Sequence, residues 1–176
     1  MTAFTAQRPA PDEYDSHFAG YVARVPEGDV LAHLAAQVDR TCALLARLTG
    51  EQSLFRYAPG KWTIREVVGH VTDAERVFAY RGLRAARGDV TPLPSFDENL
   101  FVANARFNRR SLDDLVGEFR DVRRATLSLA RSLDEPQWTR RGVAGGHPVS
   151  VRACLYMIAG HELHHVDLLG ARYGLR

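Results

Sequence analysis

The chain has 176 residues, 45% of them hydrophobic and 25% charged, which is the composition of an ordinary soluble globular protein. A net charge of +2, without a basic stripe, argues against a nucleic-acid partner. The length fits a single domain over residues 1–176, with a core at about residues 14–174.

The N-terminus and the cysteines bear on location. Residues 1–14 lack the apolar core of a signal peptide, and no apolar run approaches the roughly 20 residues of a membrane span. Cys42 and Cys154 are too few for a disulfide framework and fall in apolar helical patterns, which favours buried free thiols. We therefore predict a cytoplasmic protein with no membrane partner.

The first half of the chain predicts two long helices from apolar residues at helical spacing. One covers residues 30–48, beginning after the N-cap Asp29, and a short helix is expected before it within residues 14–25. The second covers residues 64–87, where Thr63 and Glu66 form a capping box.

The second half begins with a long connection, residues 88–110, with one short helix near residues 98–103. A third long helix is predicted over residues 112–133, and a fourth from Ser150 to Tyr173. The glycine-rich segment between them gives no convincing hairpin signal. Four amphipathic helices with one long connection predict an all-α, up-down four-helix bundle.

The fourth helix carries two histidines, His161 and His165, on one face. A spacing of four residues puts them roughly 40° apart on the helix, one turn above the other. Met157 and Ile158 share that face, so both imidazoles are expected to point into the bundle. Such a pair can chelate one metal ion, but spacing alone leaves open two buried histidines satisfied by hydrogen bonds.

A third histidine, His70, favours the metal. Val67, Ala74 and Val77 lie on its face of the second long helix, so it also points inward. Three buried neutral imidazoles without a metal would need three separate sets of partners. Together with His161 and His165, His70 can fill three positions of a divalent ion and leave the rest for water or substrate.

His161, Glu162 and His165 also match the H-E-x-x-H motif of zinc peptidases, in which the glutamate is the general base. The extended motif needs glycine and histidine where Leu168 and Ala171 stand. Only 11 residues follow His165, so there is no room for a third ligand well downstream. A peptidase remains a minor alternative.

Two segments together resemble the DinB/YfiT-like superfamily: PGKWTIREVVGHVTDAERVFAYR at residues 59–81 and SVRACLYMIAGHELHHVDLL at residues 150–169. The resemblance covers the chain from about residue 14 to the end. It implies a four-helix bundle of this type, with the long connection between its second and third helices. It also implies a zinc or nickel site at His70, His161 and His165, and a homodimer.

The resemblance implies an enzyme as well. Known members transfer bacillithiol or glutathione to electrophiles or use mycothiol in maleylpyruvate isomerisation, and others are described only as metal-dependent hydrolases. Three neutral ligands leave the ion its full charge, so a bound thiol or water becomes nucleophilic. The leading hypothesis is a bacillithiol-type S-transferase acting on a small-molecule thiol and an electrophile. The alternatives are a hydrolase using metal-bound hydroxide and a non-catalytic metal-binding protein.

Other residues have less defined roles. Asp73 and Arg81 match recurrent positions of the YfiT-like branch: Asp73 is a ligand-supporting or outward acid, and Arg81 binds an acidic substrate or forms an ion pair. His164 lies at the edge of the histidine face and supports the site or packs. The remaining histidines, His17, His33 and His147, are interpreted as surface or local residues. Because the connection over residues 88–110 is long and carries Phe96, Phe101 and Phe107, we expect it to border the metal pocket.

Overall fold

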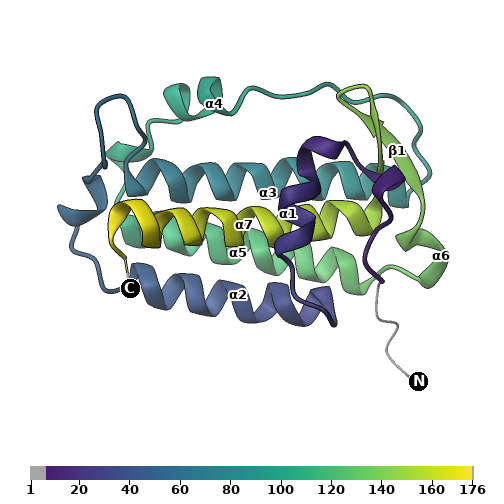
Figure 1. Ribbon diagram of the computed structural model, residues 1–176, viewed down its shortest axis with the longest axis horizontal. Coiled ribbons are helices and arrows are strands. Elements are labelled where there is room, and N and C mark those ends of the chain that lie inside the picture. Colours follow the sequence, from purple (N-terminus) through teal and green to yellow (C-terminus); the bar gives the residue numbers. More distant parts are fainter. Residues whose placement is uncertain (1–6, 176) are drawn as a thin grey trace.

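The computed structural model describes residues 7–175 and has four long helices packed as a bundle (Figure 1). They are α2 (Val30–Leu45), α3 (Ile64–Ala86), α5 (Leu112–Arg131) and α7 (Val151–Tyr173). Each begins at a side chain that caps its first turn: Asp29, Thr63, Ser111 and Ser150. The predicted all-α four-helix bundle with a long connection is confirmed.

The long connection decides how the helices are directed. It carries the chain back along the bundle, so that α5 starts where α3 starts and runs parallel to it (Figure 1). The predicted up-down order therefore does not hold between these two helices. Arg65, in the first turn of α3, donates a hydrogen bond to the Arg110 carbonyl just before α5. In contrast, α7 runs antiparallel to α3: the Tyr173 hydroxyl at the end of α7 donates a hydrogen bond to the backbone oxygen of Trp62, just before α3. This arrangement places α7 against both α3 and α2, with its most extensive contact on α3.

Short elements lie around the four long helices (Figure 1). Before α2 lie η1 (Pro11–Glu13), η2 (Ser16–Phe18) and α1 (Ala19–Arg24), and η3 (Gln52–Leu54) precedes α3. The connection holds α4 (Glu98–Ala105) and η4 (Phe107–Arg109), and α6 (Glu135–Trp138) follows α5.

Two glycines permit close packing next to candidate ligands. A Cβ at Gly160 would lie 1.9 Å from the backbone oxygen of Tyr21, so only glycine lets α1 rest on α7 there. A Cβ at Gly69 would lie 2.4 Å from the ring of Phe107, so glycine also admits η4 against α3. Either Cβ would lie far inside van der Waals contact. The two glycines therefore allow the elements that surround the histidines to pack closely.

The chain contains a hairpin, and the prediction that it has none was wrong. Strands β1 (Arg141–Ala144) and β2 (His147–Ser150) pair antiparallel, with Ala144 opposite His147. The two turn residues, Gly145 and Gly146, have φ of 60° and 85°, which is the conformation that a two-residue hairpin turn needs. Strands of four residues are too short to show a clear alternation, so the glycine pair was the usable signal.

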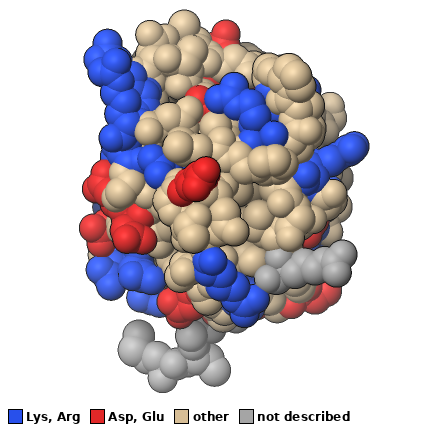
Figure 2. Space-filling view, turned by 90° about the vertical axis from the view of Figure 1, so that its left-hand side faces the viewer, with Lys and Arg blue, Asp and Glu red and all other residues tan. Residues whose placement is uncertain are grey.

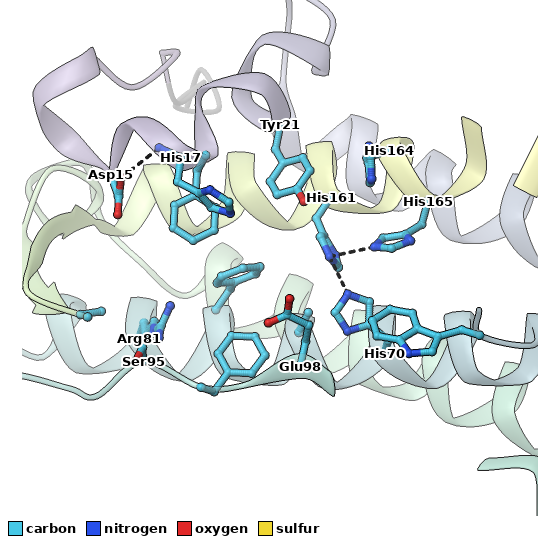
Figure 3. A pocket seen from close by; sticks show the side chains of 17 residues that line it. Asp15, His17, Tyr21, His70, Arg81, Ser95, Glu98, His161, His164 and His165 are labelled. Atoms are coloured by element: carbon cyan, nitrogen blue, oxygen red, sulfur yellow. Dashed lines mark hydrogen bonds between the residues drawn. The ribbon is translucent and has the colours of Figure 1, made fainter. Parts of the chain in front are cut away.

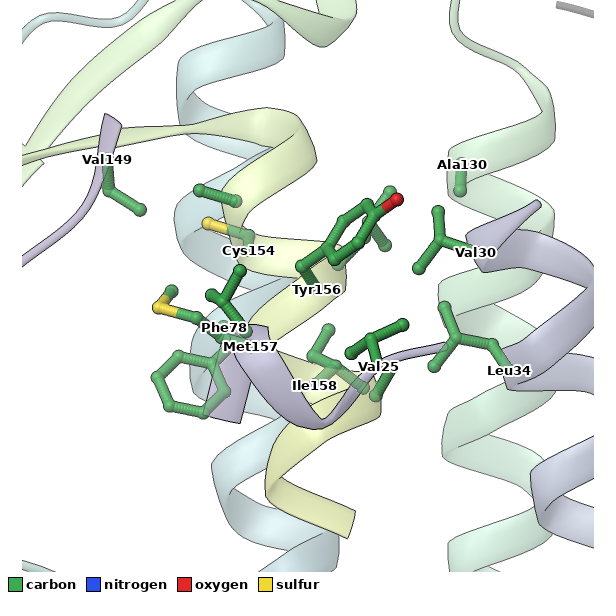
Figure 4. Packing of buried hydrophobic residues seen from close by; sticks show 14 of the residues in the cluster. Val25, Val30, Leu34, Phe78, Ala130, Val149, Cys154, Tyr156, Met157 and Ile158 are labelled. Atoms are coloured by element: carbon green, nitrogen blue, oxygen red, sulfur yellow. The ribbon is translucent and has the colours of Figure 1, made fainter. Parts of the chain in front are cut away.

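The main core surrounds α7 (Figure 4). Met157, Ile158 and Cys154 of α7 pack there with Leu34 of α2 and Phe78 of α3. Cys154 and Cys42 are both buried free thiols, as predicted. At the end of the bundle where α7 terminates, charges of both signs are interspersed on a largely uncharged surface (Figure 2). No helix within residues 7–175 is both long and apolar enough to cross a membrane.

Candidate metal centre

The three predicted ligands converge between α3 and α7 (Figure 3). Nε2 of His161 lies 3.0 Å from Nε2 of His70 and 3.1 Å from Nε2 of His165. All three side chains are buried, with at most 7% of their surface exposed. The antiparallel packing of α3 and α7 thus brings together residues that are 91 positions apart in the sequence.

Burial keeps these imidazoles neutral. It lowers the pKa of His70 to about 4 and that of His165 to about 3, and it holds the pKa of His161 well below its usual value. At neutral pH each ring therefore carries one N–H and one lone pair. Neutral imidazole is the form that binds a metal.

The donor set fits one divalent cation. Nε2 of His161 has either one lone pair or one proton, so it satisfies only one of its two short contacts by hydrogen bonding. A cation bound between the rings would accept the lone pairs of all three at once. Ligand nitrogens that bind one ion tetrahedrally through bonds of about 2 Å lie about 3.3 Å apart, close to the two Nε2–Nε2 distances observed here.

The surroundings of the ligands are mostly aromatic. The Trp62 ring lies against His70, with centroids 4.7 Å apart, and Tyr21 of α1 meets His161 edge-on at 5.3 Å. Nδ1 of His165 is buried and has no hydrogen-bond partner within residues 7–175, so packing rather than an acceptor orients this ring. Tyr21 and Trp62 were not predicted, because they lie outside the long helices, where no periodicity places them.

A pocket of about 330 Å³ opens beside the histidines (Figure 3). The long connection lines it through Ser95, Phe96 and Glu98, which confirms that this segment borders the site. Phe101 packs on Phe96 from outside the pocket, with centroids 5.3 Å apart. Phe107 instead packs against Gly69, on another face of α3.

Arg81 and Asp73, the two residues predicted to assist the site, lie in different surroundings. Arg81 lines the pocket, whereas Asp73 forms an ion pair with Arg76 at 3.1 Å and is not part of the pocket wall. Burial raises the pKa of Asp73, which the hydrogen bond from Arg76 opposes. The alternative of an outward acid therefore describes Asp73.

Two further histidines lie on the pocket wall. His164 lines it and packs against the rings of Tyr21 and His165, as expected for an edge residue. His17 is exposed, as expected, but it also lines the pocket, a position that the sequence did not indicate. It lies in the short 3-10 helix η2, whose Phe18 packs edge-on against Phe78 of α3.

Glu162 does not serve the histidine site. Its carboxylate accepts hydrogen bonds from Thr41 at 2.6 Å and from Arg123 at 2.8 Å, and Arg123 also pairs with Glu75. Burial raises the pKa of Glu162, and the charge of Arg123 opposes that shift. A peptidase general base must face the metal and its water, so this arrangement argues against the peptidase alternative.

We expect acid to destabilise the metal-free protein through the buried histidines. A lowered pKa in the folded state means that the unfolded state binds more protons below pH 6.5, so stability is complete above that pH and falls below it. For His70, a shift from 6.5 to about 4 corresponds to roughly 2 kcal/mol lost between pH 8 and pH 5.

Urea unfolding of the metal-free wild type and of His70→Gln at both pH values measures this loss. Titrating groups shared by the two proteins cancel in the difference. Equal losses of stability in the two proteins would contradict the prediction.

The fold and the site together define a class: four-helix bundles with three converging histidines at the wall of an open pocket. The family model described as the DinB superfamily matches residues 7–169, and the chain belongs to that superfamily.

Several known proteins are similar to this chain. YfiT from Bacillus subtilis, described as a probable metal-dependent hydrolase with an unusual four-helix bundle topology, superposes with a TM-score of 0.70 at 18% identity, covering 97% of this chain and 95% of YfiT. A mycothiol-dependent maleylpyruvate isomerase superposes at 0.65 with 20% identity, covering 84% of this chain and 62% of the isomerase. The protein named "Putative metal-dependent hydrolase OB0413" from Oceanobacillus iheyensis is 25% identical over 138 residues, which are 77% of this chain and 79% of that protein. The structural likenesses establish the shared fold.

Proposed function

We propose that this protein is a divalent-metal-dependent enzyme that transfers a low-molecular-weight thiol of the bacillithiol type to an electrophile. The observation that carries the proposal is the convergence of three neutral, buried imidazoles on one point beside an open pocket. Zinc or nickel bound there would act as a Lewis acid and hold an entering thiol in its nucleophilic, deprotonated form.

The reaction then follows ordinary substitution. The thiol proton passes to solvent, and the sulfur attacks the electrophilic carbon of the second substrate. A carbon–sulfur bond forms while the leaving group departs with its bonding electrons. His70, His161 and His165 would hold the metal through Nε2.

Residues around the pocket assist by position. Trp62 covers His70 and excludes water from one side of the centre. Tyr21 lines the pocket beside His161, and burial raises the pKa of its hydroxyl, so it stays a hydrogen-bond donor at neutral pH. A donor at this place can orient the sulfur or the leaving group.

Hydrolysis is the second candidate. The names of YfiT and of the Oceanobacillus iheyensis protein support it, because both refer to a metal-dependent hydrolase. The same Lewis acid would activate water instead of a thiol. A structural ion is less well supported, because structural zinc sites usually have four protein ligands and the histidine cluster offers three.

The experiment begins with metal analysis of the purified protein. The zinc-loaded and nickel-loaded forms are then assayed with bacillithiol, mycothiol and glutathione against a chlorinated aromatic electrophile, and in parallel with a generic aryl ester. Thiol-dependent product supports transfer, whereas thiol-independent ester cleavage supports the hydrolase. Neither activity in either metal form would contradict both.

From the sequence and the resemblance we also propose a single domain over residues 1–176, a homodimer, a small-molecule thiol and an electrophile as partners, and a cytoplasmic location. Light scattering of the purified protein measures the oligomeric state directly.

A further inference from the structure

Arg81 is a buried cation without a countercharge. Only 7% of its surface is exposed, and it lines the pocket from α3. Its single side-chain hydrogen bond within residues 7–175 runs from Nη2 to the backbone oxygen of Pro94, at 3.1 Å. In the described part of the chain, no carboxylate lies within ion-pair distance of it.

The other deeply buried arginine makes the contrast clear. Arg123 is fully buried, and it contacts two carboxylates, those of Glu75 and Glu162. Burying an unpaired guanidinium is expensive, so such a group is normally paired or exposed. Burial lowers the pKa of Arg81, yet a guanidinium remains charged at neutral pH. Its charge therefore faces a pocket whose two lining carboxylates, Asp15 and Glu98, form no ion pair with it in the described part of the chain, and Asp15 instead contacts His147.

The walls around Arg81 hold it in place. The rings of Phe78 and Phe96 lie 5.9 Å and 5.7 Å from its guanidinium carbon, so aromatic faces flank the cation without neutralising it. The Pro94 oxygen is fixed in turn, because neighbouring Leu93 pairs with the hairpin: its N–H donates to Val143 at 2.8 Å. The hairpin and the connection thus build this end of the pocket.

The position of Arg81 sets a length for a ligand. Arg81 follows His70 by eleven residues, or about 16 Å along the helix axis, and its long side chain leans back toward His70. Figure 3 shows the histidines at one end of the pocket, and Arg81 with Ser95 at the other. The Glu98 carboxylate lies between them, which disfavours an anion bound midway.

We propose that Arg81 forms a carboxylate subsite, so that the pocket takes an elongated acidic substrate. Its carboxylate binds the Arg81 guanidinium and its reacting end reaches the three histidines. The guanidinium is suited to this, because its planar donors match a carboxylate and such charge-assisted hydrogen bonds are strong. The assignment of the reacting end rests on the proposed function, whereas the carboxylate subsite does not.

The first experiment tests the subsite alone, in metal-free protein, where no metal competes for the carboxylate. Isothermal titration calorimetry compares hexanoate with hexanol, which has the same chain but no charge. We expect hexanoate to bind tighter by tenfold or more, on the order of one charged hydrogen-bonded pair. Arg81→Met should remove the preference, and Arg81→Lys should keep part of it. Equal binding of the two ligands to the wild type would overturn the proposal.

The second experiment tests the carboxylate end and the reacting end of one ligand at the same time. It uses cobalt-loaded protein, in which a thiolate on the metal gives a visible absorption band. Mercaptopropanoic and mercaptoundecanoic acids are compared with the matched mercaptoalcohols. The long acid should bind at least about tenfold tighter than its alcohol, and the short acid should show no preference over its alcohol. No band with any thiol, together with a hexanoate preference, would contradict the thiol-transfer function and uphold the subsite. A band with all thiols but no acid preference in either experiment would contradict the carboxylate subsite and agree with the thiol-transfer function.

Discussion

Replacing both His161 and His165 with alanine is expected to lower the affinity for zinc or nickel by about a thousandfold or more. The ligands of a zinc site share roughly 10–16 kcal/mol of apparent binding free energy, so two of three cannot be lost without a large effect. Metal analysis after dialysis against a weak chelator measures the loss. His164→Ala is the matched control, because His164 neighbours the site without belonging to the cluster.

The double variant should remain folded. The bundle buries a core that does not depend on the ion, and side chains cap its four long helices. Removing metal from the wild type should therefore abolish activity while leaving the helical circular dichroism signal largely unchanged. Loss of that signal on chelation would indicate a structural ion. Unchanged metal content in the double variant would place the metal elsewhere.

The convergence of the three histidines could be predicted because helical geometry is regular. Residues four apart on one helix share a face, so His161 and His165 were expected on the same side from spacing alone. His70 needed one further inference, that its apolar neighbours turn it inward. The helix starts were also predictable, since Thr63 and Glu66 form the expected capping box with hydrogen bonds in both directions.

What the sequence did not predict depends on how elements meet. Tyr21 reaches His161 only because Gly160 lets α1 approach α7. Tyr21 and Gly160 are 139 residues apart, so no local pattern predicts their contact. The sequence likewise did not decide whether Arg81 forms an ion pair or lines a pocket, because both roles fit the same position on the helix. Only the packed structure shows which acids lie within reach.

Arg123→Met is expected to destabilise the protein by about 3–5 kcal/mol at neutral pH, the usual effect of breaking a buried ion pair. Arg123 is fully buried, with Nη2 at 2.9 Å from Glu75 and 2.8 Å from Glu162. Removing it leaves two carboxylates buried together without a cation. Arg124→Met is the matched control, because that side chain is 71% exposed and its ion pair with Asp121 should contribute less than about 1 kcal/mol.

A triple variant, Arg123→Met with Glu75→Leu and Glu162→Leu, tests the cause. If uncompensated charge is the source of the loss, apolar replacement of all three groups should recover most of the stability, as urea unfolding would show.

Glu162→Gln distinguishes a residue of the buried charge network from a general base. A network residue should lose stability but keep metal content and turnover in the folded protein, whereas a general base should lose turnover at unchanged stability. The second outcome would restore the peptidase alternative, and the first agrees with a carboxylate already engaged by Arg123 and Thr41.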